Sequence, residues 1–190
     1  MDPVPIGAGG NSFKDIDSQK LFKELNLTNN SVFLDLACGY GDYSLAALDY
    51  MGQKGQIYAI DLWAEGIEAL KDKINKNNIQ RITPIIQDVS QTLPLQQDSI
   101  DICLIATVLH DFIEVNNAKQ VLKQVKRVLK TGGKLAILEF KKEDSQEGPP
   151  NEIRLLPQDV ENHLLPYSFR KIKYVDMGKR HYLMIFENNS

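Results

Sequence analysis

The chain has 190 residues, of which 43% are hydrophobic and 25% charged, a composition that suits one globular domain with a sizeable core. Its formal net charge of -3 and sequence pI near 5.6 indicate no basic face, so no nucleic-acid partner is expected. No run approaches the roughly 20 apolar residues of a membrane span, and the N-terminus has neither a basic start nor an apolar core, so we expect a cytoplasmic protein without a membrane span.

Strand and helix patterns alternate along the first half of the chain. An apolar run at 32–37 (VFLDLA) predicts a buried strand, and helical spacing follows at 43–51. A second strand is predicted at 57–62 and an amphipathic helix at 64–78. Strands separated by helices are typical of a mostly parallel sheet with helices on both faces.

The same alternation continues through the middle of the chain. We predict a third strand at 82–87 and a fourth at 100–112, followed by an amphipathic helix at 116–130. A helix-stopping TGG then opens a fifth strand at 132–140.

The C-terminal part leaves this rhythm. A polar loop with two adjacent prolines at 141–152 precedes a short helix at 156–166. Two strands at 169–177 and 181–187 are joined by GKR, a spacing that predicts a hairpin. The sheet should therefore end in an antiparallel pair.

The two cysteines, Cys38 and Cys103, lie inside apolar runs with no CxxC or Cys/His spacing. This pattern predicts neither a zinc site nor a disulfide framework, and it fits a reducing compartment. We expect no metal.

The turn DLACGYGDYS, residues 35–44, places Gly39 and Gly41 directly after the first strand. A dinucleotide-binding loop would want a glycine or alanine where Ser44 stands. The carboxylate of Asp35, ahead of the glycines, would repel a pyrophosphate but attract a cationic ligand, directly or through water. The turn therefore favours a cationic ligand over a phosphate, with a nicotinamide-dependent oxidoreductase as the alternative.

Polar residues stand at the ends of four predicted strands, where an open α/β sheet binds its ligand. Asp61 closes the second strand about 20 residues after the second glycine, a spacing at which a carboxylate takes both ribose hydroxyls of a nucleoside. An adenosine-containing ligand is therefore favoured. The other strand ends carry Asp35, Asp88, Thr107, His110 and Asp111.

Four motifs in order, DLACGYG, YAIDL, IIQDVSQTLPLQQDSIDICLIATVLHDF and LKTGGKLAILEF, resemble those of class I S-adenosylmethionine-dependent methyltransferases over roughly residues 31–140. The segment GPPNEIRLLPQDV resembles small stand-alone members of the ubiquinone/menaquinone-biosynthesis type (methyltransferase type 11/25). The resemblance implies an α/β, Rossmann-like three-layer sandwich whose seven-stranded, mostly parallel sheet has an antiparallel C-terminal strand. We expect one domain over 1–190: an N-terminal cap segment (1–30), a cofactor-binding core (31–140) and a C-terminal helix and hairpin (141–190).

The resemblance also implies S-adenosylmethionine as the cofactor and S-adenosylhomocysteine as the product. By similarity the backbone around the glycine turn would hold the methionine end, Asp61 the ribose, and Leu62 one face of the adenine. The positions with implied or inferred cofactor contacts are Asp35, Ala37, Gly39, Gly41, Asp61, Leu62, Asp88, Val89 and Thr107.

His110, after the fourth strand, is the candidate catalytic base, because its ordinary pKa near 6.5 suits proton removal from an acceptor. Packing or capping of the loop is the alternative role. Asp111 could orient His110 or face solvent, and Glu139 is a further polar candidate. The acceptor is expected to be a small molecule. A non-catalytic module that only binds S-adenosylmethionine stays open as a second alternative.

Overall fold

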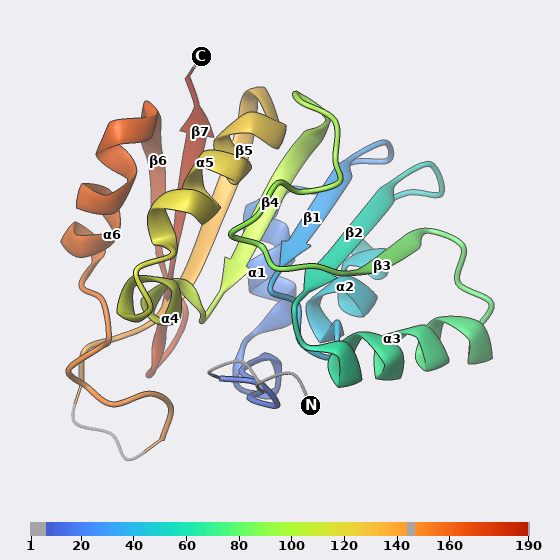
Figure 1. Cartoon of the computed structure of the whole chain (residues 1–190), viewed down its shortest axis with the longest axis horizontal. Helices are drawn as coiled ribbons and strands as arrows, with labels where there is room; N and C mark the ends of the chain where they lie inside the picture. Colours follow the sequence, from blue (N-terminus) through green and yellow to red (C-terminus); the bar gives the residue numbers. More distant parts are fainter. Residues whose placement is uncertain (1–6, 144–146, 190) are drawn as a thin grey trace.

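The computed structural model describes residues 7–143 and 147–189, and these form one seven-stranded sheet in the order β3-β2-β1-β4-β5-β7-β6 (Figure 1). Strands β1 to β5 run parallel, and β7 is antiparallel to both β5 and β6. The strands are β1 (Val32–Leu36), β2 (Gln56–Asp61), β3 (Ile82–Ile86), β4 (Ile100–Ala106), β5 (Leu129–Phe140), β6 (Phe169–Asp176) and β7 (His181–Asn188). The predicted fold class, with its antiparallel end, is confirmed.

Helices cover both faces of the sheet because each strand sends alternate side chains to opposite sides. Phe33 and Ile102 belong to one apolar cluster, whereas their neighbours Leu34 and Cys103 belong to the other. The first cluster packs under α1 to α3 and the second under α4 to α6. The helices are α1 (Ser18–Leu25), α2 (Asp42–Ala47), α3 (Ala64–Lys76), α4 (Leu109–Glu114), α5 (Ala118–Val128) and α6 (Pro157–Leu164), with 3-10 turns η1 (Phe13–Asp15), η2 (Leu48–Tyr50) and η3 (Leu165–Tyr167).

Several predicted boundaries were wrong, among them the start of the fifth strand, which was expected at 132 but lies at Leu129, so that the TGG stands inside the strand. The fourth strand ends at Ala106 rather than at 112, because Thr107 has a left-handed backbone (φ 54°) and α4 begins two residues later. The helix predicted to reach 130 ends at Val128, and extended Leu129 already pairs with Ile100. The helix predicted to reach 51 ends at Ala47 and continues as η2.

Helix α1 was not predicted. Its signal is an N-cap at Asp17, whose side chain accepts the backbone N–H of Lys20, followed by buried Leu21, Phe22 and Leu25. These three side chains pack into the first apolar cluster, which also contains Phe33 of β1.

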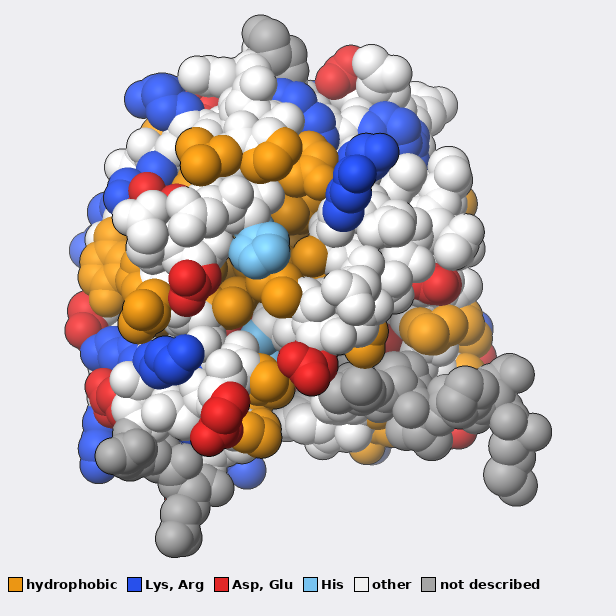
Figure 2. Space-filling model, turned by 60° about the vertical axis from the view of Figure 1, so that its left-hand side comes forward, with side chains coloured by type: hydrophobic (Ala, Val, Ile, Leu, Met, Phe, Trp, Pro, Cys, Tyr) orange, Lys and Arg blue, Asp and Glu red, His pale blue; other side chains and the backbone are white. Residues whose placement is uncertain are grey.

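The face that carries α6 and β6 shows gathered apolar side chains (Figure 2). Leu156 and Leu165 flank α6, and Ile172 and Tyr174 lie on β6; all four are exposed. Within the described ranges, no helix is long and apolar enough to cross a bilayer.

Candidate active site

The loop after β1 has a left-handed backbone at three positions, Ala37 (φ 58°), Gly39 (φ 54°) and Gly41 (φ 70°). A Cβ on Gly39 would meet nothing within 4 Å, so its backbone is bare toward open space. A Cβ on Gly41 would lie 2.5 Å from Cδ2 of Leu70 on α3, so this glycine serves helix packing instead. Gly41 is also the N-cap of α2, which begins at Asp42.

A cavity of about 1090 Å³ opens at the carboxyl ends of the parallel strands, next to the crossover between β1 and β4. This volume lies slightly above the roughly 300–1,000 Å³ that is usual for small-molecule sites. Of the ten residues predicted as catalytic or cofactor-binding, eight line it: Ala37, Gly39, Asp61, Leu62, Asp88, Val89, Thr107 and His110. Asp35 and Gly41 do not.

Asp35 lies inside the fold, beneath the glycine turn. Its side chain is almost fully buried, and its Oδ2 accepts the hydroxyl of Ser44 at 2.6 Å. Burial raises the pKa of this carboxyl to about 7, although the bonds from Ser44 lower it and the charges of Asp61 and Asp42 raise it further. Asp35 does not line the cavity, so this geometry gives no direct contact between its carboxyl group and a cationic ligand. An effect through water stays a prediction, and the carboxyl group supports the turn from below.

Asp61 joins the ends of β1 and β2. Its Oδ2 accepts the backbone N–H of Gly39 and its Oδ1 that of Trp63, both at 2.7 Å. Burial raises its pKa, and the bonds from the backbone partly counteract that rise. Each oxygen can accept a second hydrogen bond, so the carboxylate can still bind a ligand hydroxyl.

Leu62, directly after β2, is an apolar side chain left 50% exposed on the cavity wall. Asp88 and Val89 follow β3 and also line the cavity. The Oδ1 of Asp88 accepts the backbone N–H and the hydroxyl of Ser90, which holds the carboxylate at the strand end. An apolar face beside two carboxylates suits a flat ring with a hydroxylated substituent.

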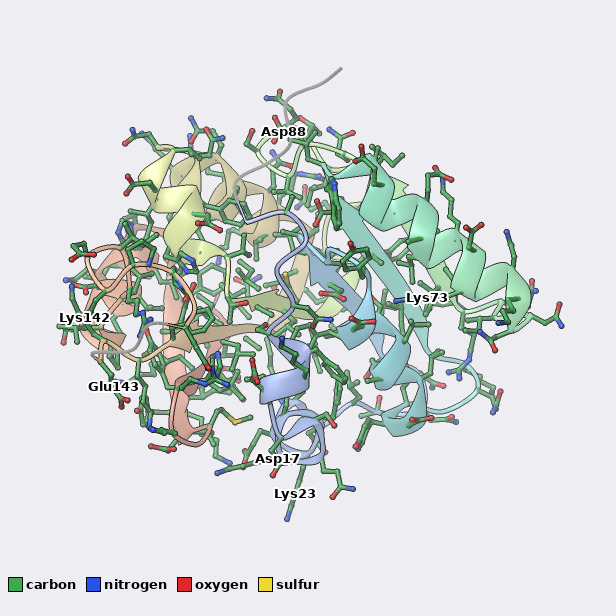
Figure 3. All side chains as sticks on the ribbon, turned by 90° about the horizontal axis from the view of Figure 1, so that it is seen from below. Asp17, Lys23, Lys73, Asp88, Lys142 and Glu143 are labelled. Carbon is green, nitrogen blue, oxygen red and sulfur yellow. The ribbon has the colours of Figure 1, made fainter. Side chains whose placement is uncertain are left out.

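The N-terminal segment 7–15 covers the cavity from one side. Figure 3, which looks onto the carboxyl ends of the strands, shows this segment crossing in front of the central strands. The hydroxyl of Ser12 bonds to Tyr43 and Thr107, each at 2.9 Å, and the Nδ2 of Asn11 donates to Asp42 at 2.7 Å. Thr107, predicted as a strand-end residue with a cofactor contact, thus also holds this cover. No local pattern revealed these contacts.

The loop that contains Gly148, Pro149 and Pro150 covers the other side of the cavity. Buried Arg154 holds it by donating to backbone carbonyl oxygens, including those of Pro149 at 2.9 Å and Glu147 at 2.7 Å. Arg180 of the β6–β7 turn pairs with both Asp15 and Glu147, so it joins the two covering segments.

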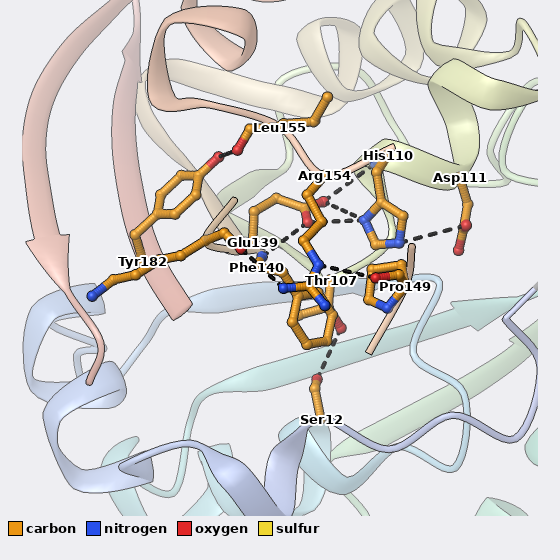
Figure 4. A network of polar contacts seen from close by, with 11 residues as sticks. Ser12, Thr107, His110, Asp111, Glu139, Phe140, Pro149, Arg154, Leu155 and Tyr182 are labelled. Carbon is orange, nitrogen blue, oxygen red and sulfur yellow. Dashed lines mark hydrogen bonds and ion pairs between the residues drawn. The ribbon is translucent and has the colours of Figure 1, made fainter. Parts of the chain in front are cut away.

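His110 lies in the wall between these covers, at the start of α4 (Figure 4). Its Nδ1 is 2.9 Å from Oε2 of Glu139, and its Nε2 is 3.5 Å from Oδ1 of Asp111. Burial lowers the pKa of His110, but the hydrogen bond and charge of Glu139, with the charge of Asp111, outweigh it and raise the pKa above 6.5. Burial also raises the pKa of Asp111.

Three features of the cavity suit a nucleoside ligand such as S-adenosylmethionine. The bare backbone of Gly39 permits close approach, Asp61 offers acceptors for ribose hydroxyls, and Leu62 offers an apolar face. The ends of β1 and β4 carry the strained residues Ala37 and Thr107, and such strain often marks a functional site.

The model of the family described as "Methyltransferase domain" matches residues 27–189. The chain belongs to this family. Demethylmenaquinone methyltransferase of Lactobacillus johnsonii is 35% identical over 121 residues, which are 64% of this chain and 48% of that protein. The 2-phytyl-1,4-naphtoquinone methyltransferase of Trichormus variabilis is 26% identical over 149 residues, 76% of this chain and 64% of that protein.

A SAM-dependent methyltransferase from Aquifex aeolicus has the same fold, with a TM-score of 0.84 and 27% identity over 94% of this chain and 93% of that chain. By contrast, the chain spans about half the length of the curated relatives that it matches. The comparisons give no support to a nicotinamide-dependent oxidoreductase. The absence of a nucleic-acid partner and the cytoplasmic location stay predictions.

Proposed function

We propose that this chain binds S-adenosylmethionine in the cavity and transfers its methyl group to a small-molecule acceptor held beside His110. The observation that carries the proposal is the continuity of one cavity from the bare Gly39 backbone and Asp61 to His110 and the Gly148–Pro150 loop. A cavity of about 1090 Å³ has room for two reactants side by side. Family membership supports the same reaction.

The residues of the chain would divide the work. The turn after β1 would hold the methionine end, Asp61 the ribose, Leu62 the adenine face, and Asp88 with Val89 its edge. When bound, S-adenosylmethionine supplies an activated methyl group, so the protein needs to orient the acceptor, exclude water and remove a proton. We assign that last step to His110, and the two covering segments would exclude water.

We also propose the division of the chain. Residues 7–30 of the cap segment cover the cavity and the first apolar cluster, 31–140 carry the cofactor residues, and the remainder adds α6 and the hairpin. Support for one domain comes from the single sheet to which both apolar clusters attach.

The names of the two relatives suggest the first acceptor to test. Both names specify a naphthoquinone-type substrate. The apolar side chains of Phe112, Phe140 and Ile153 line the cavity together with His110. A reduced 1,4-naphthoquinone is therefore a suitable probe, because its ring fits an apolar wall and its hydroxyl has a proton to lose.

Calorimetric titration with S-adenosylmethionine, S-adenosylhomocysteine and NAD⁺ tests the cofactor. We expect heat with the first two only; no heat with either would overturn the proposal. Transfer of labelled methyl to reduced 1,4-naphthoquinone tests the reaction. Binding without transfer to this probe or to a wider panel of small acceptors would favour the non-catalytic module.

A further inference from the structure

The carboxyl group of Glu139 bonds to both the ring and the backbone of His110 (Figure 4). Glu139 lies on β5 and is fully buried. Its Oε2 and Oε1 lie 2.9 and 3.1 Å from Nδ1 of His110, and Oε1 also accepts the backbone N–H of His110 at 3.2 Å. Because both the ring and the backbone of His110 are bound by one rigid strand residue, the imidazole has a defined orientation.

The other ring nitrogen points elsewhere. Both oxygens of Glu139 accept backbone N–H groups, Oε1 that of His110 and Oε2 that of Phe140, so the side chain acts as an acceptor and the Nδ1 that faces it carries a proton. In the neutral imidazole this leaves a lone pair on Nε2. That nitrogen lies 3.5 Å from Oδ1 of Asp111, and both His110 and Asp111 line the cavity whereas Glu139 does not.

We propose that Glu139 is a positioning residue that keeps the proton on Nδ1 of His110 and thereby presents Nε2 as the base toward the acceptor end of the cavity. The role of Nε2 toward an acceptor rests on the proposed function, whereas the position of the proton on the imidazole ring does not. The bond between the acceptor and its hydrogen breaks, its electron pair stays on the acceptor, and the proton binds Nε2. Asp111 stabilises the resulting imidazolium, which later returns the proton to water.

Charged groups face the ring from three elements. Burial lowers the pKa of His110, Glu139 on β5 and Asp111 on α4 raise it, and Arg154 ahead of α6 lowers it slightly, with a net rise. The edge of the Phe140 ring completes the surroundings. The neutral base is therefore populated only as the pH rises, so methyl transfer should increase with pH through the midpoint of His110 and level off above it.

Nuclear magnetic resonance of the imidazole nitrogens tests the state of the ring in the protein without any ligand. The chain has three histidines, so His110 can be assigned by its loss in His110→Gln. In the neutral ring we expect the proton on Nδ1, and Glu139→Gln should lower the titration midpoint by about one pH unit or more, because it removes the nearest negative charge. A proton on Nε2 in the wild-type protein would overturn the proposal.

A matched control is Glu187→Gln, which removes a carboxylate from the same sheet; Glu187 pairs with Arg170 and stands opposite Lys134, toward the far end of β5. It should leave the midpoint of His110 unchanged. An equal midpoint in Glu139→Gln and in the wild type would contradict the inference. If Glu139→Gln fails to fold, the wild-type position of the proton and a lower midpoint in Asp111→Asn decide the question.

The failure of this inference can be separated from that of the proposed function. If neither S-adenosylmethionine nor S-adenosylhomocysteine binds, the proposed function fails while the state of the ring is still measured. If reduced 1,4-naphthoquinone is methylated, the midpoint of the pH-rate profile should move to lower pH in Glu139→Gln. An unmoved midpoint would leave the methyltransferase proposal intact and remove Glu139 from its positioning role.

Discussion

Replacing Asp35 by asparagine should change how the stability of the protein depends on pH. The carboxyl group is buried under the glycine turn and accepts the hydroxyl of Ser44. Burial raises its pKa from 3.8 to about 7, a difference of about three pH units. Each pH unit corresponds to about 1.4 kcal/mol, so the full effect is on the order of 4 kcal/mol.

The sign follows from the direction of the shift. Below pH 3.8 the carboxyl group of Asp35 keeps its proton in both the folded and the unfolded chain, so folding has no charge to bury. Between pH 3.8 and about 7 the unfolded chain loses the proton while the folded protein keeps it, and the free energy of unfolding falls. Above about pH 7 the folded protein carries the whole cost.

Urea unfolding of the wild type and Asp35→Asn between about pH 4 and about pH 8 measures this difference. The amide keeps an oxygen that accepts from Ser44 but cannot ionise, so the variant should gain stability relative to the wild type as the pH rises. Asp72→Asn, at an exposed position of α3, is the matched control and should show no such trend. A constant difference between Asp35→Asn and the wild type across this range would refute the reasoning.

Further predictions concern the turn, the ribose site and the base. Gly41→Ala should lower the free energy of unfolding by about 2 kcal/mol, because the new Cβ would collide with Leu70 and because alanine disfavours the left-handed backbone at this position (φ 70°). A Cβ at Gly39 would meet open space, so Gly39→Ala should lower the free energy of unfolding less, by about 1 kcal/mol, and should weaken S-adenosylhomocysteine binding. Equal losses of stability in the two variants, measured by urea unfolding, would contradict these separate roles. Asp61→Asn should weaken that binding roughly 10-fold or more in calorimetry, since it removes charge-assisted hydrogen bonds, and an unchanged affinity would remove Asp61 from the site. His110→Ala should leave S-adenosylhomocysteine affinity nearly unaltered but slow methyl transfer by about 10²-fold or more; joint loss of affinity and stability would assign it to packing.

The alternation of strands and helices was predictable from the sequence because it depends on local periodicity. Once the sheet was expected to be parallel, the carboxyl ends of its strands had to share an edge, which placed Asp61, Asp88 and His110 near one another. Strand and helix ends were less predictable. Apolar residues continue past the end of β4 at Ala106 and past the end of α5 at Val128, so only the backbone geometry shows where each element ends.

Which residues of the turn face the cavity depends on tertiary packing rather than on the local sequence. Gly39 and Gly41 share a left-handed backbone and a motif, but open space surrounds one and Leu70 of another helix contacts the other. Asp35 carried the same charge in the sequence as Asp61, yet it faces Ser44 inside the fold. The role of each residue depends on which side chain from another part of the chain packs against it, and the local sequence pattern does not contain that information.

The partners of His110 were decided in the same way. The sequence predicted a histidine after the fourth strand, and it marked Asp111 next to it and Glu139 at the end of the fifth strand as further polar candidates. The pairing with Glu139 joins positions 29 residues apart, and the bond from Thr107 to Ser12 joins positions 95 apart. These contacts exist because parallel strands β4 and β5 lie in register and the N-terminal segment returns over their ends. Long-range packing therefore determined which nitrogen of His110 is bound and which one is presented to the cavity.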